Sequence, residues 1–195
     1  MADTLNLKGT KTADNLALAY VAESTAYTRY TYYAQQAEKE QLFQYRDIFN
    51  ETADNELHHG KIFLKYLVEG GVTPGTVSVD SGVLSDTKTN LQISIKEETF
   101  EGVDLYRKAA KTAQEEGFAD LAVQFNAIAD VEDHHRARFE RMLKRLEEGT
   151  VWKRNEPVEW KCEVCGYIFK GTEPPKVCPA CKHLYQHYDA PDYWA

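Results

Sequence analysis

The chain lacks the features of a membrane or secreted protein. No apolar run in its 195 residues approaches the ~20 residues that a membrane-spanning helix needs. The first residues, MADTLNLKGTKT, are polar and contain no apolar segment of the kind that signal peptides carry. We therefore expect a cytoplasmic protein that does not enter membranes.

Basic residues are also in deficit. The sequence has 23 Lys and Arg against 31 Asp and Glu, which gives a net charge of −8. A negative field of this kind repels nucleic acid and anionic lipid surfaces, so we expect neither as a partner. The apolar content of 43% and the charged content of 28% are ordinary for a globular protein.

Cysteine is absent until position 162, and the four that follow are paired by two-residue gaps. They are Cys162, Cys165, Cys178 and Cys181, in the pattern C-x2-C-x12-C-x2-C. In a reducing compartment this spacing favours a four-thiolate metal site over disulfides. Structural zinc and a single iron ion both fit the spacing.

Long proline-free patterns precede the cysteines and predict four helices. We expect them at about 12–41, 45–69, 89–116 and 118–148, the first capped by Thr12 or Asp14. The connections within the first and second pairs are short, which predicts two antiparallel hairpins. The link at 72–86 with its flanks spans roughly 18 residues, enough to cover ~60 Å and run the length of a bundle. The sequence thus predicts a mainly α fold, a ferritin-like four-helix bundle with one long crossover.

The pattern changes after the fourth helix, where Val, Trp and Tyr alternate with Gly and Pro. We place a boundary there, with a bundle at 1–149 and a small β/turn domain at 150–195. About 45 residues are too few for a self-sufficient apolar core, so a metal must hold this domain together.

Two stretches in the second and fourth helices share one pattern, DNELHH at 54–59 and DVEDHH at 130–135. Residues three apart share a helix face, which pairs Glu56 with His59 and Glu132 with His135. Each pair interrupts the apolar stripe of its helix. The remaining acids and histidines of the two motifs are predicted to lie on the surface: Asp54, His58, Asp130, Asp133 and His134.

The other two helices also carry acids on their apolar faces. Glu23 lies on the first, and Glu98 and Glu101 lie on the third. Five buried carboxylates without basic partners would be prohibitively costly, so cations must compensate them. A Glu from each of two helices and Glu-x-x-His from the other two is the di-iron or di-manganese signature of such bundles. We expect two iron ions.

Spacing singles out Glu101. Glu23 precedes Glu56 by 33 residues and Glu98 precedes Glu132 by 34, which makes Glu98 the counterpart of Glu23. A seventh ligand allows an exchange when the metal changes oxidation state. Oxidised iron would favour the carboxylate of Glu101, and reduced iron would accept the imidazole of His59.

Taken together, the bundle motifs A-E-S, E-L-H-H, E-T-F-E and E-D-H-H and the tail motifs C-E-V-C-G-Y and C-P-A-C resemble the rubrerythrin family over nearly the whole chain. The resemblance implies a non-haem di-iron peroxidase that reduces hydrogen peroxide to water and protects against oxidative stress. It also implies that Tyr30 and Tyr106 form hydrogen bonds near the irons. Tyr30 is two turns from Glu23, whereas Tyr106 lies only at the edge of the Glu98 face.

The same context favours iron over zinc in the tetrathiolate site. Gly166, Tyr167 and Pro179 are similar to the metal-binding turns of rubredoxin, whose backbone N–H groups bond to the thiolates. Lys182 departs from rubredoxins, which commonly have Gly there, and a positive φ at this position would strain it. Electrons would come from an external donor, a rubredoxin or an NAD(P)H-dependent reductase.

Geometry and resemblance both favour a head-to-tail homodimer, because the tail lies far along the helix axis from the di-iron site of its own chain. Two other functions remain open at this point. One is iron handling, as a ferroxidase or store in the manner of ferritin. The other is a structural role with zinc in the tail.

Overall fold

The computed structural model describes residues 5–73, 77–78 and 82–193. The bundle consists of six helical segments. These are α1 (Lys11–Lys39), α2 (Phe43–Glu69), α3 (Thr87–Thr99), the π-helical segment η1 (Phe100–Tyr106), α4 (Arg107–Glu115) and α5 (Ala119–Glu148). Because α3, η1 and α4 follow one another without a break, they form the single third helix that the sequence predicts.

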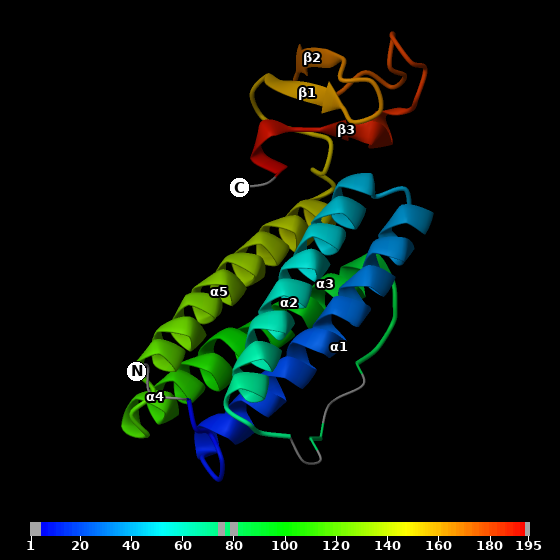
Figure 1. Ribbon diagram of the computed structural model, residues 1–195. Coiled ribbons are helices and arrows are strands. Elements are labelled where there is room, and N and C mark those ends of the chain that lie inside the picture. The colour runs from blue at the N-terminus through cyan, green and yellow to red at the C-terminus, as the bar shows by residue number, and fades with distance from the viewer. Residues whose placement is uncertain (1–4, 74–76, 79–81, 194–195) are drawn as a thin grey trace.

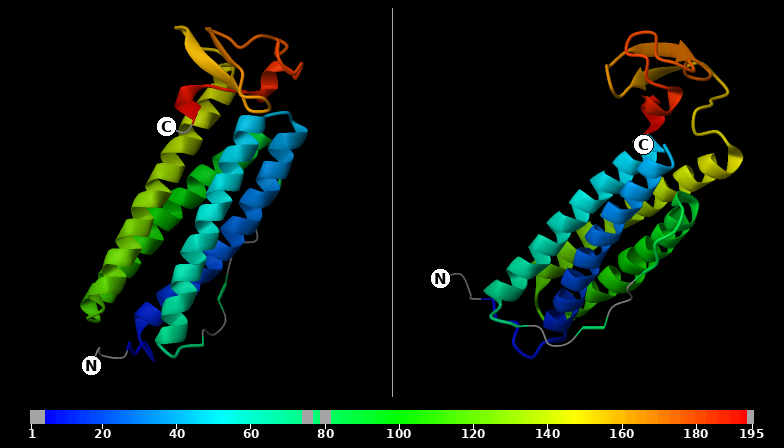
Figure 2. Two further views of the ribbon diagram at one scale, coloured as in Figure 1. Left: turned by 45° about the horizontal axis from the view of Figure 1, so that its top comes forward. Right: turned by 90° about the vertical axis from the view of Figure 1, so that its right-hand side faces the viewer.

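The helices form a four-helix bundle with one long crossover (Figure 1). α1 packs mainly against α2, and α3 and α4 pack against α5, so each pair is an antiparallel hairpin. The crossover runs along the bundle, and α2 and α3 point in the same direction (Figures 1 and 2). The predicted ferritin-like topology is therefore confirmed, although residues 74–76 and 79–81 of the crossover lie outside the described residues.

The first helix begins earlier than predicted. Thr10 is the N-cap and accepts a hydrogen bond from the backbone N–H of Ala13 at 3.1 Å. Thr12 is buried inside the helix, where its N–H and hydroxyl donate to the Glu116 carboxylate at 2.9 and 2.6 Å. An acid from the third helix thus binds the free N–H groups at the start of α1, which the local sequence could not show.

Two apolar clusters occupy the two halves of the bundle. One is built around Leu16, Phe63 and Phe125, and the other around Phe49 and Phe139. The acids predicted on the core stripes belong to neither cluster and lie between these halves along the helices. The bundle therefore holds a polar layer between two well-packed apolar ones.

The segment η1 corrects one prediction for the third helix. The sequence places Tyr106 only at the edge of the Glu98 face, but Tyr106 is completely buried and its neighbour Leu105 is only half-buried. A π-helical turn accommodates one extra residue, which rotates the following side chains by about one position. In a regular α-helix the residue seven positions after Glu98 would lie on the same face as Glu98. Here Tyr106, eight positions after Glu98, takes that place.

The C-terminal module is a three-stranded antiparallel sheet in the order β2-β1-β3. Its strands are β1 (Val158–Cys162), β2 (Ile168–Gly171) and β3 (Tyr188–Asp189), and short 3₁₀ turns η2 (Tyr185–His187) and η3 (Pro191–Tyr193) flank β3. Trp160 is completely buried and donates from its indole N–H to the carbonyl of Gly171 at 2.9 Å. The small core contains few other large side chains, as expected of a domain that a metal stabilises.

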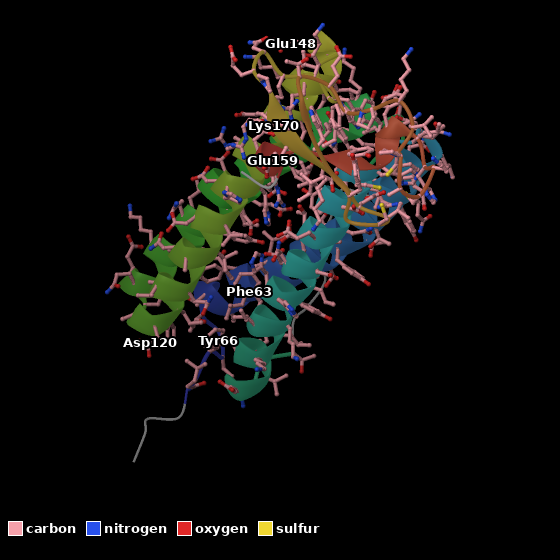
Figure 3. The ribbon with its side chains drawn as sticks, turned by 90° about the horizontal axis from the view of Figure 1, so that it is seen from above. Phe63, Tyr66, Asp120, Glu148, Glu159 and Lys170 are labelled. Carbon is pink, nitrogen blue, oxygen red and sulfur yellow. The ribbon has the colours of Figure 1, made fainter. Side chains whose placement is uncertain are left out.

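The module sits on one end of the bundle. Seen from above, Glu148, Glu159 and Lys170 all lie toward one end of the molecule, whereas Tyr66 and Asp120 lie toward the opposite end (Figure 3). Contacts join the parts: the rings of Phe43 and His187 stack 4.1 Å apart, Arg46 pairs with Glu163 at 3.2 Å, and Arg145 pairs with Asp192 at 2.7 Å. No helix in the described part of the chain combines the length and apolar character that crossing a bilayer requires.

Candidate metal centres

The structure brings the predicted ligands of the bundle together. All seven are nearly inaccessible to solvent, and the most exposed of them, His59, retains 8% of its surface. They come from four helical segments, α1, α2, α3 with η1, and α5. The set is Glu23, Glu56, His59, Glu98, Glu101, Glu132 and His135.

Six of these side chains form two overlapping groups of four. In each group the ligand atoms all lie within 4.8 Å of one another. One group is Glu23, Glu56, His59 and Glu132, and the other is Glu56, Glu98, Glu132 and His135. Because Glu56 and Glu132 belong to both groups, the arrangement suits two metal ions bridged by two carboxylates.

The donor atoms also fit metal binding chemically. Carboxylate oxygens of Glu23, Glu56, Glu98 and Glu132, and Nδ1 of His135, are buried without a hydrogen-bond partner among the described residues. Buried polar atoms are nearly always paired in folded proteins, so a cluster of unpaired ones calls for an additional partner. Carboxylate and imidazole donors together suit iron.

The electrostatics of the site show the same need for positive charge. Burial, with neighbouring carboxylates, raises the pKa of Glu23, Glu98 and Glu101 well above the usual value. Burial would also raise the pKa of Glu56, but His135 and His59 hold it at about 2. Without metal, protons are the only cations that can balance this layer, and iron ions would replace them.

Glu101 belongs to neither group of four. It is 5% exposed, and its side chain has no hydrogen bond among the described residues. His59 has the opposite placement, with Nδ1 3.6, 3.0 and 3.2 Å from carboxylate oxygens of Glu23, Glu56 and Glu132. The structure therefore places His59 among the acids of the site and Glu101 beside them.

The two predicted tyrosines reach across the bundle in a symmetric way. Tyr30 on α1 donates its hydroxyl hydrogen to Glu98 at 2.5 Å, and Tyr106 at the end of η1 donates to Glu23 at 2.6 Å. Both hydroxyls are buried, and burial together with the adjacent carboxylate raises the pKa of each tyrosine well above its usual value. The hydroxyls therefore remain protonated donors near neutral pH.

Three residues near the site were missed from the sequence. Asn55 lies 3.5 Å from Nε2 of His135, on the side away from the metal-facing Nδ1. Arg29 and Arg138 are buried cations, but they pair with Glu97 and Glu51 rather than with the ligands. Of these three residues, only Arg138 could have been expected near the site from the sequence, because it lies three residues after His135 and so on the same helix face.

The surface assignments within the two motifs hold. Asp54, His58, Asp130 and His134 are exposed, and Asp133 is half-buried. Arg107 pairs with Asp130 at 2.5 Å and with Asp133 at 3.7 Å. These residues help to join the helices and take no part in either group of ligands.

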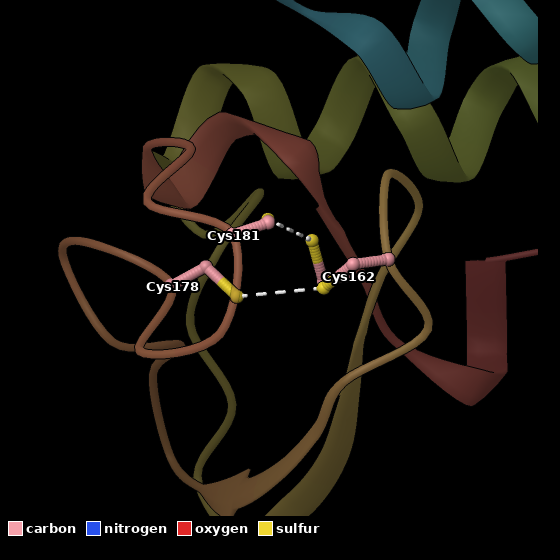
Figure 4. Close-up of side chains that lie close together, drawn as sticks. Cys162, Cys178 and Cys181 are labelled. Carbon is pink, nitrogen blue, oxygen red and sulfur yellow. Dashed lines mark hydrogen bonds between the residues drawn. The ribbon is translucent and has the colours of Figure 1, made fainter.

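The four cysteines of the module converge on one point (Figure 4). The sulfurs of Cys162 and Cys181, and those of Cys165 and Cys178, are 3.7 Å apart. This is too long for a disulfide, whose sulfurs are about 2.05 Å apart. Four sulfurs placed tetrahedrally at about 2.3 Å from a metal would be about 3.8 Å apart, so the geometry fits a single metal ion.

Backbone N–H groups surround these thiolates. Burial raises the pKa of Cys162 to about 12, although N–H groups of Cys165 and Val164 oppose the shift. At Cys178 burial also raises the pKa, but the N–H of Cys181 and the Tyr188 hydroxyl bring it down to about 6. Such donors are typical of metal-binding turns that tune a redox centre.

The turn after the fourth cysteine has the backbone that the sequence analysis anticipated. Lys182 has a φ of 68°, and Gly166, which follows the first pair of cysteines, has a φ of 75°. The two turns are therefore equivalent in shape, and the second accommodates a side chain in the left-handed region at a small cost in strain.

Comparison with known proteins places this geometry in context. A family profile described as Rubrerythrin matches residues 14–143 and again 89–166, and a profile described as Rubrerythrin, rubredoxin-like domain, matches residues 160–188. The chain is 46% identical to Rubrerythrin-1 of Clostridium acetobutylicum over 94% of its own length and 96% of that protein. It is 40% identical to the rubrerythrin of Porphyromonas gingivalis, covering 94% and 92% of the two chains.

Solved structures agree with the fold. The fully reduced, all-ferrous state of nigerythrin superposes with a TM-score of 0.65 at 26% identity and covers 97% of this chain and 91% of that one. A mixed-valence state of nigerythrin gives 0.62. The similarity spans both the bundle and the module.

Proposed function

Because the chain belongs to the rubrerythrin family, as a di-iron protein with a rubredoxin-like domain, we propose that it is a peroxidase that reduces hydrogen peroxide to water. The reaction is H2O2 + 2 H⁺ + 2 e⁻ → 2 H2O. The observation that carries the proposal is the pair of ligand groups that share Glu56 and Glu132, in one chain with a tetrathiolate site. The iron pair, when bound, supplies the two electrons.

The protein side chains would hold and orient the reacting groups. Glu56 and Glu132 would contribute to both metal positions, Glu23 and His59 would complete one group, and Glu98 and His135 would complete the other. Tyr30 and Tyr106 fix the terminal carboxylates Glu98 and Glu23 by hydrogen bonds. Both hydroxyls remain protonated, so they are suited to keep these hydrogen bonds at the site.

Glu101 would be the exchanging ligand of this arrangement. It lies beside the site without a hydrogen bond among the described residues, whereas His59 occupies the position next to Glu23. A carboxylate favours oxidised iron, so Glu101 would replace His59 when the metal is oxidised.

The module would return electrons one at a time through iron bound by the four cysteines, which an external donor reduces. A rubredoxin or an NAD(P)H-dependent reductase would serve as that donor. The N–H groups around the thiolates would stabilise their negative charge, as they do in iron–thiolate redox centres.

A head-to-tail homodimer would bring the two centres close. Glu148, where α5 ends, is 13 residues beyond His135, so the module of the same chain begins ~20 Å away along the axis. Exposed apolar side chains at Leu57, Leu64 and Val68 follow α2 away from its own module. The module has exposed apolar side chains of its own, including Val164 and Ile168, and these would cover the α2 stripe of the partner.

The test is a single turnover. Iron-loaded protein is reduced without oxygen, one equivalent of peroxide is added, and visible absorption is recorded. The proposal predicts that peroxide is consumed, that no O2 is released and that the dinuclear centre is oxidised. Unreacted peroxide, or the release of O2, would contradict it.

Iron handling is the second candidate, since the ferritin-like bundle is compatible with it. A ferroxidase would oxidise added Fe²⁺ with O2 and retain the product, and would do so equally well without the module. The tetrathiolate site disfavours this function, because storage has no use for it.

A further inference from the structure

Two cavities lie on opposite sides of Glu23 on α1. The first, here called the Glu101 cavity, has a volume of about 430 Å³ and lies between α1, Ser78 and the helix formed by α3 and η1. The second, the Glu56 cavity, has a volume of about 620 Å³ and lies between α1 and α2. Ala22 lines the first and Ser24 lines the second, one on each side of the ligand.

We propose that the Glu101 cavity is the entrance through which a small, neutral hydroperoxide reaches the metal site, and that Glu101 is its gate. The inference rests on the proposed peroxidase function. To that function it adds the route by which the substrate reaches the metal site, the residue that gates this route, and the chemical class of substrate that can pass through the cavity.

The position of Glu101 supports a gate. Glu101 lines the cavity, yet it is only 5% exposed and lies next to the ligand groups. Among the described side chains it has no hydrogen bond to break. A movement of this one carboxylate toward the metal or away from it would close or open the path.

The Glu56 cavity lacks a movable group of this kind. Glu56, which lines this cavity, belongs to both ligand groups, and Nδ1 atoms of His59 and His135 lie 3.0 and 3.3 Å from its oxygens. A molecule that arrived on this side would have to displace a bridging ligand. The Glu101 cavity requires no such displacement.

The walls of the Glu101 cavity indicate what can pass. Leu18, Ala22, Phe100 and Leu105 give the cavity an apolar part. Its charged part includes Lys96 and Arg29, and Arg29, only 8% exposed, pairs with Glu97. The five buried carboxylates of the site would repel an anion. The volume is many times the ~30 Å³ that one water occupies, so a short alkyl hydroperoxide fits as well as hydrogen peroxide.

A matched pair of substitutions tests the route. Ala22→Phe fills the Glu101 cavity, and Ser24→Phe, two residues away on the same helix, fills the other. Protein reduced beforehand is mixed with hydrogen peroxide or tert-butyl hydroperoxide, and the rate constant of oxidation is measured. A single turnover needs no transfer between chains, so a disturbed dimer does not affect it.

We expect Ala22→Phe to lower the rate constant at least tenfold for hydrogen peroxide and further for tert-butyl hydroperoxide. Ser24→Phe should leave both within twofold of the unsubstituted protein. Equal rates in all three proteins, or a larger loss in Ser24→Phe, would overturn the proposal. Iron content and module colour establish that the variants are intact.

A widening variant covers the case in which Ala22→Phe does not fold. Phe100 is 53% exposed at the cavity, so Phe100→Ala should speed the reaction with tert-butyl hydroperoxide severalfold. Val123→Ala is the control, because Val123 is similarly exposed on α5 and lines neither cavity. The same change in both variants, or in neither, would count against the entrance.

Nitric oxide separates this inference from the proposed function. It is small and neutral and binds ferrous iron without a peroxidase reaction, so its association rate reports access alone. We expect Ala22→Phe to slow this association at least tenfold and Ser24→Phe to leave it unchanged. If the reduced, unsubstituted protein does not react with peroxide, the proposed function is wrong. The association rates of nitric oxide then still decide which cavity is the entrance.

Discussion

At the scale of single residues, the five buried glutamates differ in what surrounds them. Glu56 and Glu132 are shared between ligand groups, Glu23 and Glu98 each accept a tyrosine hydroxyl, and Glu101 stands apart. Burial alone does not distinguish them, since all are at most 5% exposed. Their neighbours decide what each can do.

Glu56→Ala should abolish peroxide turnover and leave the red colour of the ferric tetrathiolate module intact. The substitution removes an oxygen donor from both ligand groups, whereas none of the four cysteines contacts it. Peroxide consumption and visible absorption of the same sample check this. Asp54→Ala, a change at an exposed acid on the same helix, is the control. Equal loss of colour and activity would argue against two separate sites.

Glu101→Ala should weaken iron retention in the oxidised protein and spare the reduced one. His59 holds the position beside Glu23 in the present arrangement, so the missing carboxylate matters only after oxidation. Iron loss to a chelator is timed in both states, and we expect at least a tenfold acceleration in the oxidised state alone. Asp104→Ala, at an exposed acid of the same segment, serves as the control. The exchange idea fails if both states lose iron at the same rate.

Most of the site residues could be predicted because helix periodicity places i and i+3 together. The two Glu-x-x-His pairs could be assigned to a metal site without knowing how the neighbouring helices pack. Arg29 and Asn55 could not be found this way, since their contacts depend on how one helix packs against another. Their residue types alone carry no signal for a metal site.

At the scale of elements, the π-helical segment η1 is visible in the sequence only as a difference in residue spacing. The 34-residue spacing from Glu98 to Glu132, against 33 from Glu23 to Glu56, is the extra residue of the π-helical turn. Periodicity alone could not locate this turn, because a regular α-helix was assumed throughout. The same turn explains why Tyr106 mirrors Tyr30.

Gly102→Ala should disturb the bridging side of the site. A Cβ at this position would lie 3.1 Å from Cβ of Glu132 and 3.4 Å from the carbonyl oxygen of Ala129, so α5 must shift. Alanine favours helix by about 0.5–1 kcal/mol over glycine, but such overpacking costs about 1–3 kcal/mol. We expect roughly a tenfold loss of iron affinity in the bundle, measured by competition with a chelator.

Asp104→Ala is the control for this change, because Asp104 is exposed in the same π-helical segment. It should leave iron affinity unaltered, and the module should keep its colour in both variants. If Gly102→Ala binds iron as tightly as the unsubstituted protein, close packing at Gly102 does not position Glu132.

At the scale of the whole molecule, the two candidate metal centres lie in different parts of one chain, one in the bundle and one in the module. The module is joined to the bundle by contacts such as Phe43 with His187 and Arg46 with Glu163, all at one end. The ligand layer lies between the two apolar halves of the bundle. A homodimer that places the module of one chain beside the ligands of the other would shorten the path for electrons.

Mixed dimers should show transfer between chains. Cys162→Ser chains lack a complete module site, and Glu56→Ala chains lack a complete bundle site, so each should be inactive alone with an external donor. After exchange, the mixture should recover up to about a quarter of the activity, since half the dimers are mixed and each has one working pair. If verified mixed dimers stay inactive, electrons move within a chain.

The most direct test of the central claim, that iron in the module feeds peroxide reduction in the bundle, is steady-state turnover with zinc in place of that iron. Zinc fits the same four thiolates but does not change oxidation state. With an external donor, the zinc form should lose nearly all turnover and yet react once with peroxide as fast as the iron form after chemical reduction. If the zinc form turns over as fast as the iron form, the module is structural and the account is wrong.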